Sequence, residues 1–444
     1  MSQHKKGRFC IVPFIQLNTR GQGNLRVCCS ISGIPHGIPR QGTIVDVNEG
    51  RAGASGETFD LRKDSIAEVW NSEFMRDFRL RMANEEYLPN CEFCYRLEDR
   101  GINSKRVNRN NKFAENFQSV VEEAVNSTGR LSTKPIWWEL RFSTKCNLSC
   151  RMCTPALSTR MLQEYKSKQA LLTPEMRGEL EMASLLVADG HLGESEFFRK
   201  QLQGYVREAR FLEMRGGEVL VDPEAMEFLR DLSLEKKWAA QMHLDLSSNI
   251  VTLNQGHIEV FNGFKSGTIK CSVDGFAEEN EYIRHPSKWE DILAALKQLK
   301  GLHSGWNKVL QATLSAYQVC TIDRLLWFLD DFVQANGFEM TFSFTMVRDT
   351  PHLDPEIIPL EMRKESAQRV ESFLATSYLC TRSPNKEENR KMIRSLATGM
   401  LQSDEARGSE ALRAFVAHTR ALDKMRGQSV ASVFPHLGPL FIDQ

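Results

Sequence analysis

The sequence predicts an α/β protein: a partial (β/α)6 barrel of the TIM type, with a cysteine-rich N-terminal domain and a helical C-terminal tail. From Pro135 onward, six apolar or alternating runs of strand length alternate with helical stretches. Parallel neighbours need a helical crossover, so six such units in series indicate a parallel sheet. Five of the eleven cysteines lie in the first hundred residues. A doubly wound sheet is the alternative architecture.

The N-terminal domain, residues 1–130, combines loop, helix and cysteine signals. The stretch Ser32–Asp60 is rich in Gly and Pro and is typical of a loop. Residues 64–86 follow with helical spacing. One apolar stripe in them consists of Ile66, Val69, Trp70, Phe74, Phe78 and Met82. We interpret the basic run of Lys105, Arg106 and Arg109 as a solvated loop.

The barrel domain is expected over residues 135–350 and the helical tail over residues 351–444. The six expected strands cover residues 136–143, 211–216, 242–248, 268–274, 309–316 and 340–347. Helices are expected at 222–234, 288–300 and 321–336, the first capped by Asp222 with Pro223 at its first position. A charged helical insertion at 155–210 is expected over the mouth of the barrel, with a decorative surface segment as the alternative.

Composition limits the classes of partner and the location. The formal net charge is +0 and the sequence pI is about 7.1, so we expect no nucleic-acid and no membrane partner. The N-terminus has no apolar signal region, and no window reaches the eighteen or so apolar residues of a membrane span. We therefore expect a cytoplasmic protein, in which cysteines ligate metals or catalyse rather than form disulfides.

Three cysteines, Cys146, Cys150 and Cys153, lie within eight residues directly after the first expected strand. A structural zinc site has four protein ligands. Three thiolates instead hold three corners of a [4Fe-4S] cluster and leave one iron open. The C-terminal ends of barrel strands are where active sites collect, so an open iron there is a binding place for another molecule.

The segment "CNLSCRMC" resembles the signature of the radical S-adenosylmethionine (radical SAM) enzymes. The resemblance implies that S-adenosyl-L-methionine binds the open iron and is reductively cleaved to a 5′-deoxyadenosyl radical, which abstracts a hydrogen atom from substrate. It also implies an electron donor such as flavodoxin or ferredoxin. The segment "RGGE" ends the second strand, as the family's Gly-Gly-Glu does.

The same resemblance assigns further residues to the S-adenosylmethionine site. Gly216 and Gly217 would let the backbone approach the ligand, and Glu218 would accept from its ammonium group. Ser272 and Asp274 share one face of a strand, which we assign to the barrel interior. Ser272 and Arg284 would bind the cofactor's carboxylate, and Asp274 would order the turn. The remaining cofactor contacts are Met152, where many members have an aromatic residue, and Ser248 or Asn249 at the ribose.

A second group of cysteines, Cys10, Cys28, Cys91 and Cys94, supplies four ligands and so a closed site. It resembles the auxiliary iron–sulfur modules of the SPASM or twitch type, which implies an auxiliary [4Fe-4S] cluster. A zinc site is the alternative, because four cysteines that include one C-x2-C pair are also a zinc pattern. Spacing alone does not decide between Cys28 and the adjacent Cys29, and we favour Cys28.

Relatives with auxiliary clusters often act on peptides, so the resemblance implies a peptide substrate that is epimerised, cross-linked or oxidised. Two alternatives are a small metabolite substrate, such as a sugar or nucleoside, and a non-catalytic zinc- or cluster-binding scaffold. Some relatives return a hydrogen atom from a cysteine thiol, and Cys380 and Cys320 are the candidates for that catalytic role. Cys271 is expected to be a buried apolar residue.

Overall fold

The structure is a computed structural model that describes residues 7–33, 37–44, 57–99, 103–113, 117–188, 190–347, 350–402 and 408–442. Part of the loop expected at 32–60 lies outside these residues. The chain divides into two compact units. Unit 1 comprises residues 1–143, 189–216 and 235–244, and unit 2 comprises residues 144–188, 217–234 and 245–444. The domain boundaries expected from sequence stay a prediction.

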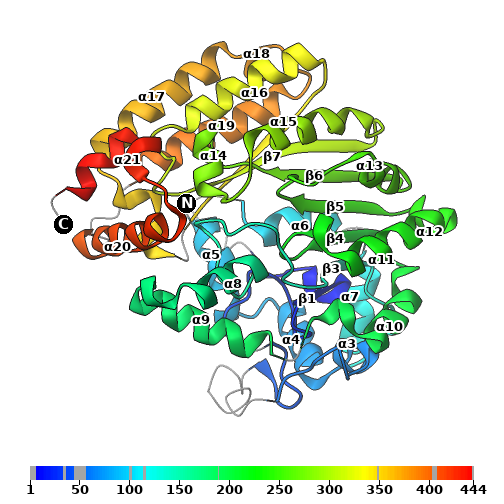
Figure 1. Cartoon of the computed structure of the whole chain (residues 1–444). Coiled ribbons are helices and arrows are strands. Elements are labelled where there is room, and N and C mark those ends of the chain that lie inside the picture. Colours follow the sequence, from blue (N-terminus) through cyan, green and yellow to red (C-terminus); the bar gives the residue numbers. More distant parts are fainter. Residues whose placement is uncertain are drawn as a thin grey trace, which may run out of the picture. The chain divides into compact units, whose positions relative to one another are not determined.

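The sheet has eight strands in the order β2-β1-β3-β4-β5-β6-β7-β8 (Figure 1). Its last six strands are β3 (Trp137–Arg141), β4 (Phe211–Arg215), β5 (His243–Ser248), β6 (Ser266–Ser272), β7 (Trp306–Leu314) and β8 (Thr341–Met346). They coincide with the six predicted strands, and the pairs β3–β4, β6–β7 and β7–β8 are parallel. The α/β class and the six-unit partial barrel are therefore confirmed.

Two strands at the N-terminus were not predicted. Strand β1 (Gln16–Thr19) follows the short helix α1 (Val12–Ile15) and pairs in parallel with β3, with Gln16 opposite Trp137. Strand β2 (Leu25–Arg26) pairs with β1 in antiparallel orientation. Strands of four and two residues are too short for a period of two to be recognised in the sequence.

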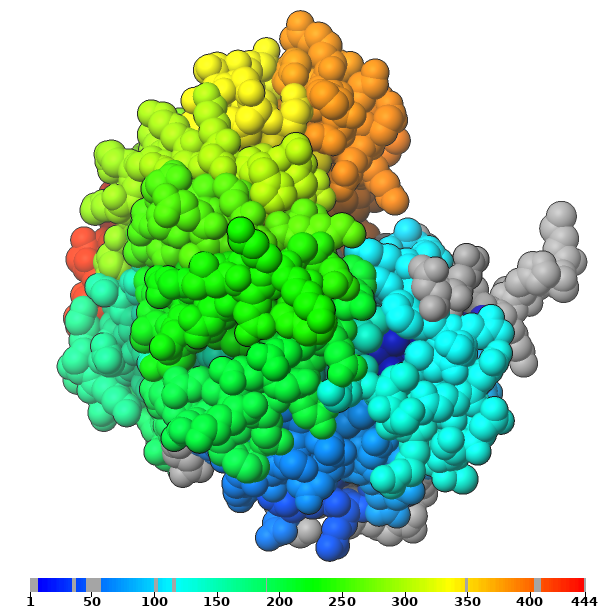
Figure 2. Space-filling model, turned by 90° about the vertical axis from the view of Figure 1, so that its right-hand side faces the viewer, coloured from blue at the N-terminus to red at the C-terminus, as the bar shows by residue number. Residues whose placement is uncertain are grey.

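The stripe at 64–86 belongs to two helices, α3 (Ile66–Trp70) and α4 (Glu73–Ala83). The side chain of Ser72 accepts from the amide of Met75, which starts the second helix. The predicted helical spacing is confirmed, and a capping serine divides the stripe between two helices. Helix α7 (Gln118–Asn126) packs against α4, and both contribute to the surface of unit 1 (cyan and blue, Figure 2).

The basic run at 105–109 is not a solvated loop. It begins helix α6 (Lys105–Phe113), which follows η1 (Pro89–Cys91) and α5 (Glu92–Asp99). Arg106 is 6% exposed and forms a buried ion pair with Glu98. Lys105 pairs with Glu139 and Arg109 with Glu213. The solvated-loop prediction failed because each of these three cations meets a carboxylate from another element.

The long insertion is helical, as predicted. Its helices are α8 (Thr159–Ser167), η3 (Gln169–Leu171), α9 (Pro174–Leu186), η4 (Leu192–Glu194) and α10 (Glu196–Val206). The helices after the later strands are η5 (Val219–Val221), α11 (Pro223–Leu234), α12 (Lys236–Ala239), α13 (Gln255–Asn262), α14 (Glu278–Ile283), α15 (Trp289–Gln298), η6 (Leu299–Gly301) and α16 (Ile322–Asn336). Asp222 accepts from the amide of Ala225, so the predicted cap is confirmed.

The C-terminal tail is helical, as predicted. It contains η7 (Pro351–Leu353), η8 (Pro355–Ile357), α17 (Leu360–Thr376), α18 (Tyr378–Thr381), α19 (Lys386–Met400), α20 (Gly408–Arg426), α21 (Val430–Val433) and η10 (Pro435–Phe441). Helices α17 and α19 pack together beside α16, whereas Leu422 and Met425 of α20 join an apolar cluster with α8 and α9 (Figure 1). No helix in the described part of the chain is long and apolar enough to cross a membrane.

Candidate functional site

The three cysteines after β3 lie in one loop of unit 2, before α8. Burial, and then the charge of Cys150, raises the pKa of Cys146 to about 12. Burial, and then the charges of Cys150 and Cys146, raises the pKa of Cys153 further. The three thiols are therefore close enough to repel one another as thiolates. Because a metal takes the thiolate form, assembly of a cluster here must release protons.

Backbone amides of the loop form hydrogen bonds at its start and in its middle. The amide of Cys146 donates to Thr159 Oγ1 at 3.2 Å, which ties the loop to the start of α8. The amides of Ser149 and Arg151, on either side of Cys150, donate to the carbonyls of His285 and Ile283 at 2.7 and 2.8 Å. The middle cysteine is thus held against the end of α14.

The C-terminal helix α20 holds the same loop through a buried ion pair. Arg151, whose side chain is fully buried, donates to Asp423 Oδ1 at 2.6 Å and to Gln428 at 3.0 Å. Its guanidinium also lies 3.6 Å from the ring centroid of Tyr282, whose hydroxyl donates to the same Asp423 oxygen. Asp423 Oδ2 accepts from the amide of Val430. Asp423 is therefore the hub of this contact.

A second arginine of α20 reaches the loop backbone. Arg426 donates to the carbonyl of Ser149 at 2.8 Å and forms a two-point ion pair with Glu164 of α8. The roles of Asp423 and Arg426 were not predicted from the sequence. No local pattern marks them, because their partners lie 272 and 277 positions away in the chain.

The Gly-Gly-Glu segment packs directly on the residues before Cys146. A Cβ atom on Gly217 would overlap the carbonyl oxygens of Thr144 and Lys145, the former at 2.6 Å. The amide of Glu218 donates to the carbonyl of Lys145 at 2.7 Å. Only glycine fits at position 217, so this segment and the cysteine loop hold each other.

Glu218 is 2% exposed, and its carboxylate joins the ends of two strands. It accepts from Ser248 Oγ at 2.7 Å and from the amides of Leu220 and Asn249 at 3.1 and 2.6 Å. Burial raises its pKa, although these donors lower it. Asn249 in turn donates to Asn147 in the cysteine loop at 2.8 Å. A carboxylate has about four acceptor positions, so capacity for one further donor remains.

Arg284 approaches the middle cysteine. It forms an ion pair with Asp274 at 2.6 Å, and its Nη1 lies 3.9 Å from Cys150 Sγ. Asp274 also accepts from the amide of Thr313 on β7 at 2.7 Å, and its expected role in ordering the turn stays a prediction. Ser272 and Met152 are both half-buried.

The N-terminal cysteines gather in unit 1. Burial, and then the charge of Cys94, raises the pKa of Cys10 to about 12. Burial, and then the charges of Cys10 and Cys94, likewise raises the pKa of Cys91 to about 12. Burial, and then the charges of Cys29, Cys10 and Cys91, raise the pKa of Cys28 well above its usual value. The set of four expected from sequence is thus brought together.

Specific contacts bring these four positions together. Antiparallel pairing of β1 with β2 turns the chain back, so that Cys28 follows β2 toward the start of β1. Arg106 donates to the carbonyl of Phe9, beside Cys10, at 2.7 Å. Ser32 and Asn90 exchange hydrogen bonds and join the segment after Cys28 to the segment before Cys91.

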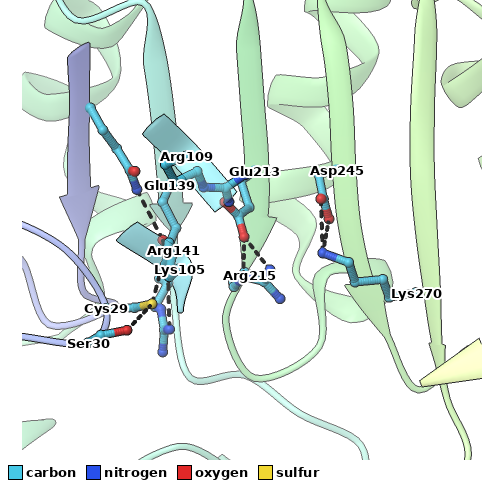
Figure 3. A network of polar contacts seen from close by, with 11 residues as sticks. Cys29, Ser30, Lys105, Arg109, Glu139, Arg141, Glu213, Arg215, Asp245 and Lys270 are labelled. Atoms are coloured by element: carbon cyan, nitrogen blue, oxygen red, sulfur yellow. Dashed lines mark hydrogen bonds and ion pairs between the residues drawn. The ribbon is translucent and has the colours of Figure 1, made fainter. Parts of the chain in front are cut away.

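Cys29 is exposed and has a different surrounding. Its sulfur lies 3.0 Å from Lys105 Nζ and 3.7 Å from Ser30 Oγ (Figure 3). Lys105 also pairs with the buried Glu139 at 3.2 Å. Cys28 interacts electrostatically with two other cysteines of the set, whereas Cys29 contacts Lys105 and Ser30.

Both thiol groups suit a cubane. Within the described ranges, no three Cys, His, Asp or Glu side chains converge as ligands of a single metal ion. A cubane spreads its sulfur ligands over separate iron corners, so convergence on one point is not required. Four thiols in unit 1 and three in unit 2 match the ligand numbers of a closed and an open cluster.

The isolated cysteines are buried. Cys271 is 0% exposed on β6, as expected. Cys320 is 6% exposed after β7, and Cys380 is 0% exposed on α18, which packs on α16, α17 and α19. Burial raises the pKa of each thiol, to about 11 for Cys320. The hydrogen-donor role of Cys320 and Cys380 stays a prediction.

Comparisons with known proteins add one family match. Residues 10–95 match the family SPASM, an iron–sulfur cluster-binding domain. This range contains all four cysteines expected to hold the auxiliary cluster. A comparison with curated proteins gave no match.

Among solved structures, SuiB from Streptococcus suis is 15% identical over 68% of this chain and 62% of its own, with a TM-score of 0.35. The structure of anSMEcpe with bound AdoMet and Kp18Cys peptide is 14% identical over 38% of this chain and 50% of its own, with a TM-score of 0.28. TYW1 with a lysine-pyruvate adduct is 14% identical over 55% and 77%, with a TM-score of 0.30. The chain thus spans half to about two thirds of the first two, and likenesses at these scores do not bear on its activity. By the family match, residues 10–95 carry a SPASM-type iron–sulfur cluster-binding domain, as the resemblance of the N-terminal cysteines to SPASM or twitch modules implied.

Proposed function

We propose that this chain is a radical SAM enzyme with two [4Fe-4S] clusters that modifies a peptide by hydrogen abstraction. The observation that supports the proposal most is the loop of Cys146, Cys150 and Cys153. Three mutually interacting thiols there are held from both sides, and no fourth protein ligand is required for an open-corner cluster. When bound, the cluster and S-adenosylmethionine supply the 5′-deoxyadenosyl radical.

The chain's own residues position these groups. Arg151, Asp423 and Arg426 fix the cysteine loop. Glu218 retains capacity for an ammonium donor, and Arg284, paired with Asp274, sits beside Cys150 where it can donate to a carboxylate. Cys10, Cys28, Cys91 and Cys94 would hold the auxiliary cluster. A peptide is the proposed substrate because auxiliary clusters of this type often accompany peptide modification in the resembled family.

The test is formation of 5′-deoxyadenosine by the anaerobically reconstituted full chain with dithionite and S-adenosylmethionine. We expect basal formation that increases when the peptide encoded beside this gene is added, and loss of both on Cys150→Ala. A Cys271→Ala variant is the matched control, since that thiol lies outside both sets. No 5′-deoxyadenosine from protein that holds its full iron would refute the enzyme. Stimulation by sugars or nucleosides but by no peptide would refute the substrate class.

The reaction type is tested with the same preparation. Epimerisation predicts uptake of one deuterium from heavy water into the product, with loss of that uptake in Cys380→Ala or Cys320→Ala if either thiol is the donor. A mass decrease without deuterium uptake indicates cross-linking or oxidation instead.

A further inference from the structure

In unit 1, one face of the sheet carries arginine side chains at its strand ends. Glu139 on β3 lies opposite Glu213 on β4, and two residues later Arg141 lies opposite Arg215. Partners in register share one face of a sheet, so a row of carboxylates is followed by a row of guanidiniums nearer the C-terminal ends. Figure 3 shows Arg141 and Arg215 beside these carboxylates.

Arg20 extends the guanidinium row beyond the end of β1. Its pKa is lowered to about 10, first by burial and then by the charges of Arg141 and Arg26. Arg20, Arg26 and Arg141 repel one another, and Glu139 offsets part of that repulsion. We define Arg20, Arg141 and Arg215 as the arginine row.

Asn18 gives an independent indication of a ligand. It lies on β1 opposite Arg26 on one side and Glu139 on the other, so it shares their face. It is 1% exposed, and neither its Oδ1 nor its Nδ2 has a hydrogen-bond partner among the described residues. A buried amide without partners is costly, so a polar group of a bound molecule would satisfy it.

We infer that the arginine row and Asn18 bind a carboxylate of the substrate, a glutamate or aspartate side chain of an acidic peptide. This inference rests on the proposed peptide substrate. The planar fork of a guanidinium matches a carboxylate, and the row already makes such pairs with Glu139 and Glu213. Phosphate sites are instead commonly built from backbone amides at a helix N-terminus.

The test is calorimetric titration of the full chain with both clusters reconstituted, which needs no turnover. The probe is acetyl-Gly-Glu-Gly-Glu-Gly-amide, compared with the same peptide carrying Gln for Glu and with inorganic phosphate. We expect the acidic peptide to bind at least about tenfold more tightly than the Gln peptide, with weakening at higher salt. Arg20→Gln should remove that preference, and Arg207→Gln, in an exposed pair with Glu235, should keep it.

Because Arg20 is repelled by its neighbours, Arg20→Gln should unfold at the same or a higher temperature than the parent protein. Asn18→Asp is the second variant, and it places a carboxylate of the chain itself beside the arginine row. It should therefore weaken binding of the acidic peptide and leave binding of the Gln peptide unchanged. The inference is overturned if Arg20→Gln keeps the preference and only shifts the reduction potential of the auxiliary cluster. It is also overturned if phosphate displaces the acidic peptide at lower concentration. Failure of the proposed function would appear separately, as absence of 5′-deoxyadenosine.

Discussion

Asp423 should control how firmly the chain retains the cluster of the three-cysteine loop. Asp423→Ala removes the partner of a fully buried Arg151 and also the acceptor for Tyr282 and Val430. Breaking a buried ion pair by removing one partner costs about 3–5 kcal/mol. Asp423 is itself 15% exposed, so we expect about 3 kcal/mol, the lower end of that range.

The lost stabilisation should make local opening of the cysteine loop more frequent. If iron leaves through an open form of the loop, about 3 kcal/mol corresponds to an increase of about 100-fold in the open population. The assay is the rate of iron transfer to a strong chelator from anaerobically reconstituted protein, followed by absorbance. Asp423→Asn, which keeps an acceptor but not the charge, should give an intermediate rate.

The control is Glu196→Gln, which breaks the exposed pair with Lys200. Both side chains there are more than 70% exposed, so little or no change in the rate of iron loss is expected. If Asp423→Ala loses iron no faster than Glu196→Gln, the C-terminal helix does not support the cluster loop and the reasoning is refuted.

Three further predictions concern backbone fit, pH and ligand identity. Gly217→Ala should reduce iron retention because its Cβ would overlap backbone oxygens. Gly178→Ala is the control: it has open space in α9 and should raise the free energy of unfolding in urea by about 0.5–1 kcal/mol. If the two variants retained iron equally well, the close fit at Gly217 would be refuted. Burial and neighbouring positive charge hold the pKa of His418 well below 6.5, so the unfolded chain binds a proton that the folded chain does not, and the free energy of unfolding should fall as pH drops below 6.5. That slope, measured by urea unfolding, should flatten in His418→Phe, and an unchanged slope would contradict the assignment. Cys28→Ala should lose about four irons in iron analysis and Cys29→Ala none, with the reverse result exchanging their roles.

Much of the fold was predictable because its signals are local. The six strands from β3 to β8 are recognisable in the sequence as apolar or alternating runs, and Asp222 before Pro223 indicates the start of a helix. Strand β1 gave no such signal. Its four residues become a strand only because a partner more than a hundred positions away, at Trp137, completes the hydrogen bonds.

The same division applies to the candidate site. Thiol spacing predicted that Cys146, Cys150 and Cys153 lie close together, because a short loop confines its own residues. The supports of that loop, Asp423 and Arg426, were out of reach because their role depends on contacts with residues more than 260 positions earlier. The basic run at 105–109 was misread for the same reason, since the carboxylates that neutralise it come from other elements.

The pairing of β1 with β3 has a consequence for engineering. Strand β1 supplies hydrogen-bonding partners along residues 137–139, so a truncation that begins after Thr19 would leave the border of β3 bare. An unpaired edge strand can pair with strands of other molecules, so we expect the shortened chain to aggregate. Main-chain hydrogen bonds thus join the N-terminal segment to β3, and we expect that removing the segment destabilises the sheet.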